Sequence, residues 1–266
     1  MRPPLLPFPA ADFQPLADAL HQLAAKRPLM YLANPGNWGA ALTREATLHF
    51  FQSYQLSVEE IAGLTPWQLV RGKWRGAVLL FGGGGAWSAE FPGGLKLVSR
   101  ALRMFAEIVV LPSTLGAPVS LPRCQLWARD RFTSLKLVPQ ARFCHDLGLF
   151  PRSLPDIVPQ ARRGEFFRND TLASPQGEPP TGSEPHRPPD LSSQGTERSP
   201  LRPFLEAIGQ YEEVHTDRVH IAIAACLLGR RCHVYPTRAP LLRDLYFSSL
   251  GPYFPQAIWH GDPLTK

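Results

Sequence analysis

The chain has 266 residues, of which 44% are hydrophobic and 19% charged, a composition ordinary for a globular protein with a sizeable core. A net charge of +6 weakly favours anionic partners, but no block of lysines and arginines interleaved with aromatic residues indicates a nucleic-acid groove. The four cysteines form no CxxC pair, so their spacing predicts neither a zinc site nor a disulfide framework. The N-terminus is broken by prolines and no apolar run reaches membrane-spanning length, so we expect a cytoplasmic protein.

Short apolar runs alternate with helical patterns in the first half of the chain. The helical patterns are "ALTREATLHFFQSY", after the first strand, and residues 95–106. The runs typical of strands lie at 27–33, 76–85, 107–114, 123–130 and 141–146. Continuously apolar strands separated by helices indicate a parallel sheet covered on both faces. We therefore predict an α/β, Rossmann-like domain over residues 1–155.

A second α/β segment begins with a strand pattern at 165–170. Residues 171–200 are polar, proline-rich and too poor in apolar residues to pack, so we predict a disordered or loosely draped loop there. A strand–helix–strand pattern follows at 211–236, and a final helix is predicted at 239–251. Residues 156–266 are therefore predicted to form a short C-terminal α/β domain.

The strand–helix–strand segment places two polar side chains at the start of an apolar helix. Thr216 is a good N-cap, Asp217 suits the first turn, and Val219–Leu228 is apolar on every side. Arg218 and His220 are two residues apart, so they converge on one ligand only if it lies over the helix N-terminus. Free N–H groups and a guanidinium would make an anion site there. The alternative is that both side chains merely face solvent, and we expect their replacement to disturb packing little.

Further candidates lie at the carboxyl ends of the predicted strands, where ligands collect in parallel α/β sheets. Two of these ends, 34–39 and 82–87, are rich in glycine. Glycine lets backbone approach a ligand, or it simply makes a tight turn. Three later strand ends carry Arg129, Arg168 and Arg218. Gathered in a cleft, three arginines would hold a small, doubly charged substrate.

Five segments of the chain stand in a definite order: "NPGNWGAAL", "LLFGGGGAW", "WARDRFTSLKL", "CHDLGLF" and "VHTDRVHIAIAACLLGRR". In order and spacing they resemble motifs of the polysaccharide pyruvyltransferase family. The resemblance extends from about residue 27 to residue 235, and the last segment is the most specific of the five.

The resemblance implies a GT-B-like enzyme in which two Rossmann-like halves face a cleft, the second half being short. Such enzymes move pyruvate from phosphoenolpyruvate to two hydroxyls of one sugar as a ketal and release phosphate, in exopolysaccharide or cell-surface glycan synthesis. We therefore expect phosphoenolpyruvate as co-substrate and a glycan or a lipid- or nucleotide-linked sugar as acceptor. We expect no cofactor, metal or nucleic-acid partner. The resemblance also allows peripheral association with membrane glycan machinery.

Carried over by position, the resemblance assigns catalytic roles to Arg218 and His220 and donor binding to Arg129 and Arg168. Arg218 would offset charge on the departing phosphate. His220 would protonate the methylene carbon of phosphoenolpyruvate, or act as a base toward the sugar hydroxyl. The remaining substrate-binding residues come from the two glycine turns: Gly36, Asn37, Gly83 and Gly84.

Two other hypotheses remain open at this level. A GT-B-type glycosyltransferase that uses a nucleotide sugar would need an acidic ribose contact in the C-terminal half, for which Glu212 and Glu213 are candidates. An inactive family member with a structural role is the other, and the shortness of the second half supports it.

Overall fold

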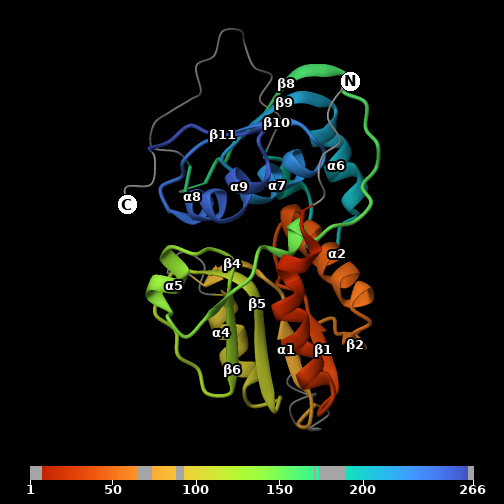
Figure 1. Ribbon diagram of the computed structural model, residues 1–266, viewed down its shortest axis with the longest axis vertical. Coiled ribbons are helices and arrows are strands. Elements are labelled where there is room, and N and C mark those ends of the chain that lie inside the picture. Colours follow the sequence, from red (N-terminus) through yellow and green to blue (C-terminus); the bar gives the residue numbers. More distant parts are fainter. Residues whose placement is uncertain (1–7, 65–73, 88–92, 171, 174–189, 263–266) are drawn as a thin grey trace. The chain divides into compact units, whose positions relative to one another are not determined.

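The computed structural model describes residues 8–64, 74–87, 93–170, 172–173 and 190–262 (Figure 1). The chain divides into two compact units. The N-terminal unit comprises Phe8–Pro35 and Thr43–Arg152, and the C-terminal unit comprises Gly36–Leu42 and the chain from Ser153 onward. The glycine turn at 36–39, which the sequence places in the first domain, therefore belongs to the second unit.

The N-terminal unit is built on a parallel sheet with strand order β2-β1-β3-β5-β6-β7, and β4 pairs with the end of β5. All four residues of β3 are buried, as expected for a strand covered on both faces. The strands are β1 (Leu29–Leu32), β2 (Val58–Glu60), β3 (Val78–Phe81), β4 (Gly84–Trp87), β5 (Glu107–Leu115), β6 (Cys124–Ala128) and β7 (Arg142–Phe143).

Amphipathic helices accompany this sheet. In α1, Leu16, Leu20 and Leu23 recur at helical spacing and are buried together. The described helices that begin before Arg152 are η1 (Ala10–Phe13), α1 (Gln14–Ala24), α2 (Trp38–Ser53), α4 (Gly93–Ala101), α5 (Thr133–Leu137) and η2 (Leu147–Leu149). Among the residues described, no helix has both the length and the apolar character needed to cross a membrane.

The C-terminal unit has a smaller parallel sheet with strand order β11-β10-β9-β8. Its strands are β8 (Ala161–Phe166), β9 (Tyr211–Thr216), β10 (Arg231–Val234) and β11 (Ala257–Trp259). Its helices are η3 (Leu191–Gln194), α6 (Leu201–Gly209), α7 (Val219–Leu227), α8 (Leu241–Leu245), the π-helical turn η4 (Tyr246–Leu250) and α9 (Gly251–Tyr253). Each strand lies beside the strand that precedes it in the chain. Because crossovers between parallel strands are right-handed, all of the connecting helices lie on the same side of this sheet.

This winding gives the smaller sheet two different faces. On one face Val214, Cys232 and Val234 are fully buried, and α6, α7, α8 and α9 lie on a single side of the strands (Figure 1). The opposite face, called here the outer face, carries polar side chains at alternate positions of β9 and β10, among them His215 and His233. Alternation of apolar and polar side chains along neighbouring strands is typical of a sheet with only one face in the core.

The two parallel sheets confirm the predicted α/β class, with a shorter second half. Three short strands, β2, β4 and β11, were not predicted as separate elements, and the expected helix at 239–251 is divided into α8, η4 and α9. Residues 171–200 were predicted to form a disordered or loosely draped loop. Disorder is wrong for residues 190–200, which contain η3 and, at Thr196, a bridge to Asn37. Residues 171 and 174–189 lie outside the described residues.

Candidate functional site

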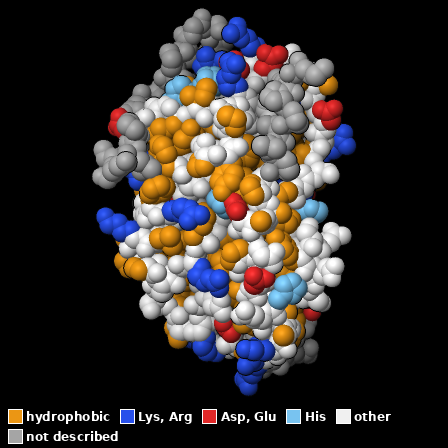
Figure 2. Space-filling model, viewed as in Figure 1, with side chains coloured by type: hydrophobic (Ala, Val, Ile, Leu, Met, Phe, Trp, Pro, Cys, Tyr) orange, Lys and Arg blue, Asp and Glu red, His pale blue; other side chains and the backbone are white. Residues whose placement is uncertain are grey.

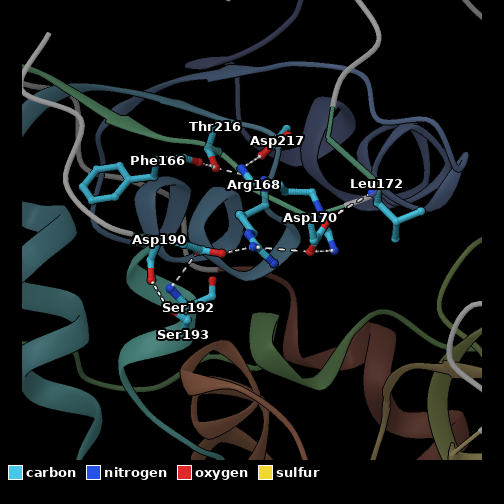
Figure 3. Close-up of polar contacts among 10 residues, drawn as sticks. Phe166, Arg168, Asp170, Leu172, Asp190, Ser192, Ser193, Thr216 and Asp217 are labelled. Carbon is cyan, nitrogen blue, oxygen red and sulfur yellow. Dashed lines mark hydrogen bonds and ion pairs between the residues drawn. The ribbon is translucent and has the colours of Figure 1, made fainter.

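Two arginines of the C-terminal unit lie on either side of one carboxylate. Arg168 follows β8 and donates to both oxygens of Asp170, from Nε over 2.8 Å and from Nη2 over 2.7 Å (Figure 3). Nη2 of Arg218 lies 3.6 Å from the same Asp170 carboxylate. Arg168 and Arg218 are thus both near one anionic group, which here is the internal carboxylate of Asp170.

Two further carboxylates complete this cluster, which we call the arginine–aspartate cluster (Arg168, Asp170, Asp190, Asp217 and Arg218). Nη2 of Arg218 donates to Asp190, which precedes η3, and the backbone N–H of Arg168 donates to Asp217 over 2.8 Å. Three carboxylates face two guanidinium groups here. The negative charge of the carboxylates must be reduced, by protonation or by displacement, before a dianion can be bound well.

The pKa values of the acids differ with their surroundings. Burial disfavours the charged form of Asp217 and raises its pKa to about 6, despite the hydrogen bond from the Arg168 backbone. Burial alone would raise the pKa of Asp170 as well, but the hydrogen bonds from Arg168 outweigh it and lower that pKa. The pKa of Arg218 is lowered by burial and by the nearby charge of Arg168. Asp217 therefore becomes neutral more readily than Asp170.

Arg218 is a buried residue rather than a surface one. Only 8% of it is exposed, and its Nε is buried without a hydrogen-bond partner among the described residues. It occupies the N-cap position of α7, and its backbone N–H donates to the hydroxyl of Thr216 over 2.9 Å. Thr216 ends β9 and is not the N-cap, which corrects the predicted helix start. The expectation that replacing Arg218 leaves packing undisturbed is also wrong, because the side chain is enclosed and ion-paired.

His220 lies in the first turn of α7, against the glycine turn. A β-carbon at Gly39 would be 2.8 Å from both the β-carbon and Nδ1 of His220, so only glycine fits there without a shift. The structure thus brings the predicted "NPGNWG" turn and the predicted histidine together within one unit. Their chain separation gave no local signal of this contact; only the shared position at strand ends suggested it.

The segment at 190–200 connects this turn to the arginine–aspartate cluster. Gly36 N–H donates to Glu197 over 3.2 Å, and Asn37 forms a bridge with Thr196. Trp38 donates from Nε1 to the Pro200 carbonyl over 2.9 Å. The same segment begins with Asp190, the partner of Arg218. Asp170 and Asp190 were not among the predicted site residues, although Asp170 stands two residues after Arg168 in the same strand-end motif.

The other predicted residues lie in the N-terminal unit. Arg129 is 2% exposed, and it donates to Asp146 over 2.6 Å and to the Thr114 hydroxyl over 2.8 Å. The side-chain amide of Asn34 donates to the Gly83 carbonyl over 3.3 Å, and Gly84 has φ of 139°, a conformation that favours glycine. Arg129 is engaged in a buried ion pair of its own unit, Arg168 and Arg218 form ion pairs within theirs, and the three-arginine cradle stays a prediction.

A separate group on the outer face could hold a metal ion. Ligand atoms of Glu213, His215 and His233 all lie within 4.8 Å of one another. Sequence reasoning expected no metal and did not find this group. The signal available was the alternation Glu213-x-His215 and His233-x-Tyr235, but only the register of β9 on β10 brings the two segments together.

Comparison with known proteins finds a similar structure but no similar sequence. A functionally uncharacterised protein of Klebsiella pneumoniae, KP1_0663, has a similar structure, with a TM-score of 0.75 and 20% sequence identity. The similarity covers 94% of this chain and 98% of that one, so it extends over both units. No family model and no curated protein matches the chain in sequence.

Proposed function

We propose that the protein is a transferase of the polysaccharide pyruvyltransferase type, which moves pyruvate from phosphoenolpyruvate to two hydroxyls of one sugar and releases phosphate. The observation that supports this best is the pair Arg168 and Arg218 around one carboxylate, with a buried Nε of Arg218 that has no hydrogen-bond partner in the part of the chain that the structure describes. Phosphoenolpyruvate carries both a carboxylate and a phosphate, which guanidinium groups recognise well.

The proposed chemistry needs one proton donor and one site for a departing anion. Protonation of the methylene carbon makes C2 of phosphoenolpyruvate electrophilic, one sugar hydroxyl adds there, and the C2–O bond to phosphate breaks. The second hydroxyl then closes the ketal, so the two hydroxyl protons balance the new methyl hydrogen and the proton on phosphate. His220 serves as the proton donor or as the base toward the hydroxyl, and Arg218 stabilises the departing phosphate.

For phosphoenolpyruvate to bind, the carboxylate of Asp170 must give up its place. Asp170 is the accessible acid of the arginine–aspartate cluster, with 40% of its side chain exposed, whereas Asp190 is 5% exposed. Displacement of Asp170 frees the bidentate donors of Arg168 and leaves the buried pair of Arg218 and Asp190 intact. The donor anion would then take the position beside Arg168 that the Asp170 carboxylate occupies.

The test is release of inorganic phosphate from phosphoenolpyruvate, measured with and without a panel of acceptor glycans. We expect acceptor-dependent release in the wild type and its loss in His220→Ala, with donor binding retained by calorimetry. A variant of an exposed histidine in the other unit, His21→Ala, is the matched control. Absence of both phosphate release and phosphoenolpyruvate binding in the wild type would reject the proposal.

A non-catalytic role in assembly is the second candidate, and one observation favours it. The ion pair of Arg218 and Asp190 is buried and ties the start of α7 to the segment at 190–200, as a structural pair would. In that case no phosphate is released, and Arg218→Ala affects the free energy of unfolding alone. Calorimetric binding of phosphoenolpyruvate to the wild type separates the two candidates.

A further inference from the structure

The outer face of the smaller sheet carries a group of histidines that the proposed function does not use. His215 on β9 and His233 on β10 are directly opposite each other in the parallel register. Their rings are stacked, with centroids 4.2 Å apart and planes 1° from parallel. Glu213 precedes His215 by two residues on the same strand, so its side chain points to the same face.

In both histidines one ring nitrogen has a polar partner, and the other has none among the residues that the structure describes. Nδ1 of His215 lies 3.0 Å from the hydroxyl of Tyr235, and Nδ1 of His233 lies 2.8 Å from Nε2 of His260. Nε2 of each ring is buried and has no hydrogen-bond partner among the described residues. A partner at Nδ1 holds the ring in place, as outer partners do for histidines that bind metals. The Nε2 lone pair of each ring is available to a metal in the tautomer whose Nδ1 carries the proton, with His215 donating to the Tyr235 hydroxyl and His233 donating to His260.

A buried, unpaired polar atom is costly, and its occurrence in both of two stacked rings requires an explanation. The nearest candidate acid is Glu213, whose carboxylate lies within 4.8 Å of both histidine ligand atoms. Two imidazole nitrogens and one carboxylate oxygen are a ligand set that suits Zn²⁺ and similar divalent transition metals better than Ca²⁺ or Mg²⁺.

We propose that Glu213, His215 and His233 form a binding site for a divalent transition metal ion of the Zn²⁺ class, through a carboxylate oxygen and the two Nε2 atoms. A tetrahedral zinc ion with bonds of about 2.0–2.1 Å holds its ligand atoms about 3.4 Å apart. To reach that spacing the three side chains must rotate toward one another and the stacked rings must tilt, because the lone pairs of two parallel rings do not point at one atom. Three protein ligands leave the fourth position open to water or to another molecule.

Some of the charged side chains around this group favour a bound metal ion, and others oppose it. The burial of His215 and the nearby positive charge of Arg163 oppose a cation at this position. Glu165 lies opposite His215 on β8, and its buried Oε2 also lacks a partner among the described residues. Arg231 opposes the metal, because its Nη1 donates to Glu213 over 2.9 Å.

The experiment is a calorimetric titration of the tag-free, chelator-treated protein with Zn²⁺, paired with the visible absorption spectrum of the Co²⁺ form. We expect one ion per chain and a cobalt spectrum without a thiolate charge-transfer band. Glu213→Gln, His215→Gln and His233→Gln should each weaken binding by more than about 100-fold, since even outer-shell changes cost roughly 10–100-fold. His21→Ala and Cys124→Ser are the controls and should bind as the wild type does.

Arg231→Gln makes the proposal testable even if a histidine variant fails to fold. Arg231 has 60% of its side chain exposed, so the variant should fold normally, and release of Glu213 should tighten Zn²⁺ binding severalfold. Zn²⁺ should also raise the wild-type melting temperature, because the ion binds the folded state. The proposal is overturned if the wild type binds no Zn²⁺ or Co²⁺, or if binding is unchanged in the folded Glu213→Gln and His233→Gln variants.

Discussion

His220 occupies the space that a side chain at position 39 would need: a β-carbon on Gly39 would lie 2.8 Å from the β-carbon of His220. Both atoms belong to helix starts, Gly39 in the first turn of α2 and His220 in the first turn of α7. Because the close atom is a β-carbon, rotation of the histidine ring cannot relieve the overlap. The backbone of one helix start must move instead.

This contact predicts that the effect of a substitution at position 39 depends on the residue at position 220. Gly39→Ala in the wild type should lower the free energy of unfolding by about 1–3 kcal/mol, the usual cost of an overpacked contact. In a His220→Gly background the overlap is gone, and alanine should then stabilise α2 by up to roughly 1 kcal/mol through its helix propensity. A double-mutant cycle by urea unfolding measures the coupling. Additive effects would mean that the contact places no constraint on either residue.

The buried pair of Arg218 and Asp190 predicts a large loss of stability. Their side chains are 9% and 5% exposed, and removal of one partner leaves an uncompensated buried charge. Arg218→Ala and Asp190→Ala should each lower the free energy of unfolding by roughly 3–5 kcal/mol. Arg202→Ala is the matched control, because its pair with Glu206 is exposed and worth about 0.5 kcal/mol or less. A small effect at Arg218 would instead support the solvent-facing arrangement that the sequence left open.

The sequence predicted the framework of this fold because its signals are local. Continuously apolar runs and glycine turns identify buried strands and their ends, and the structure places β3 and β5 there. The same reasoning put the 36–39 turn and His220 at strand ends, and they do meet. These patterns specify where the backbone is buried and where it turns. Both properties depend on residues that are close together in the sequence.

The sequence could not predict which side chains pair with each other, because the partners are not neighbours in the chain. The pairing of Arg129 with Asp146, seventeen positions later, could not be read from the strand-end pattern that suggested Arg129 for substrate binding. Asp190 was assigned to a disordered loop because its neighbours are polar, whereas its order comes from a buried arginine in another segment. The group of Glu213, His215 and His233 depends on the register of two strands, which periodicity does not reveal.

Asp170 should act as a competitor for the donor anion, if the proposed function holds. Its carboxylate accepts two hydrogen bonds from Arg168, and Asp170→Asn removes the charge that holds this guanidinium. We expect phosphoenolpyruvate to bind up to about fivefold more tightly, since a partly exposed ion pair contributes roughly 1 kcal/mol or less. Calorimetric titration of the variant measures this, with Asp262→Asn as an exposed control. Weaker binding would show that Asp170 organises the site rather than blocks it.

His145 should make the stability of the N-terminal unit depend on pH. Its ring is 2% exposed and is surrounded by the rings of Phe8, Phe13 and Phe143. Burial lowers its pKa from the ordinary 6.5 to about 4, although Asp12, 3.5 Å away, opposes the shift. Between these two pH values the unfolded chain binds a proton that the folded chain does not, so stability falls as the pH drops from 6.5 to 4.

The variant His145→Phe isolates this contribution, because it fills the same aromatic surroundings and cannot titrate. His215, His233 and His260 also have lowered pKa values, so the wild type loses stability in acid for several reasons, and the variant removes one of them. We expect the loss in unfolding free energy between pH 7 and pH 4.5 to be smaller in His145→Phe by on the order of 2 kcal/mol. Urea unfolding at the two pH values gives the comparison. Equal losses in both proteins would mean that His145 is protonated, or reached by water, in the folded state.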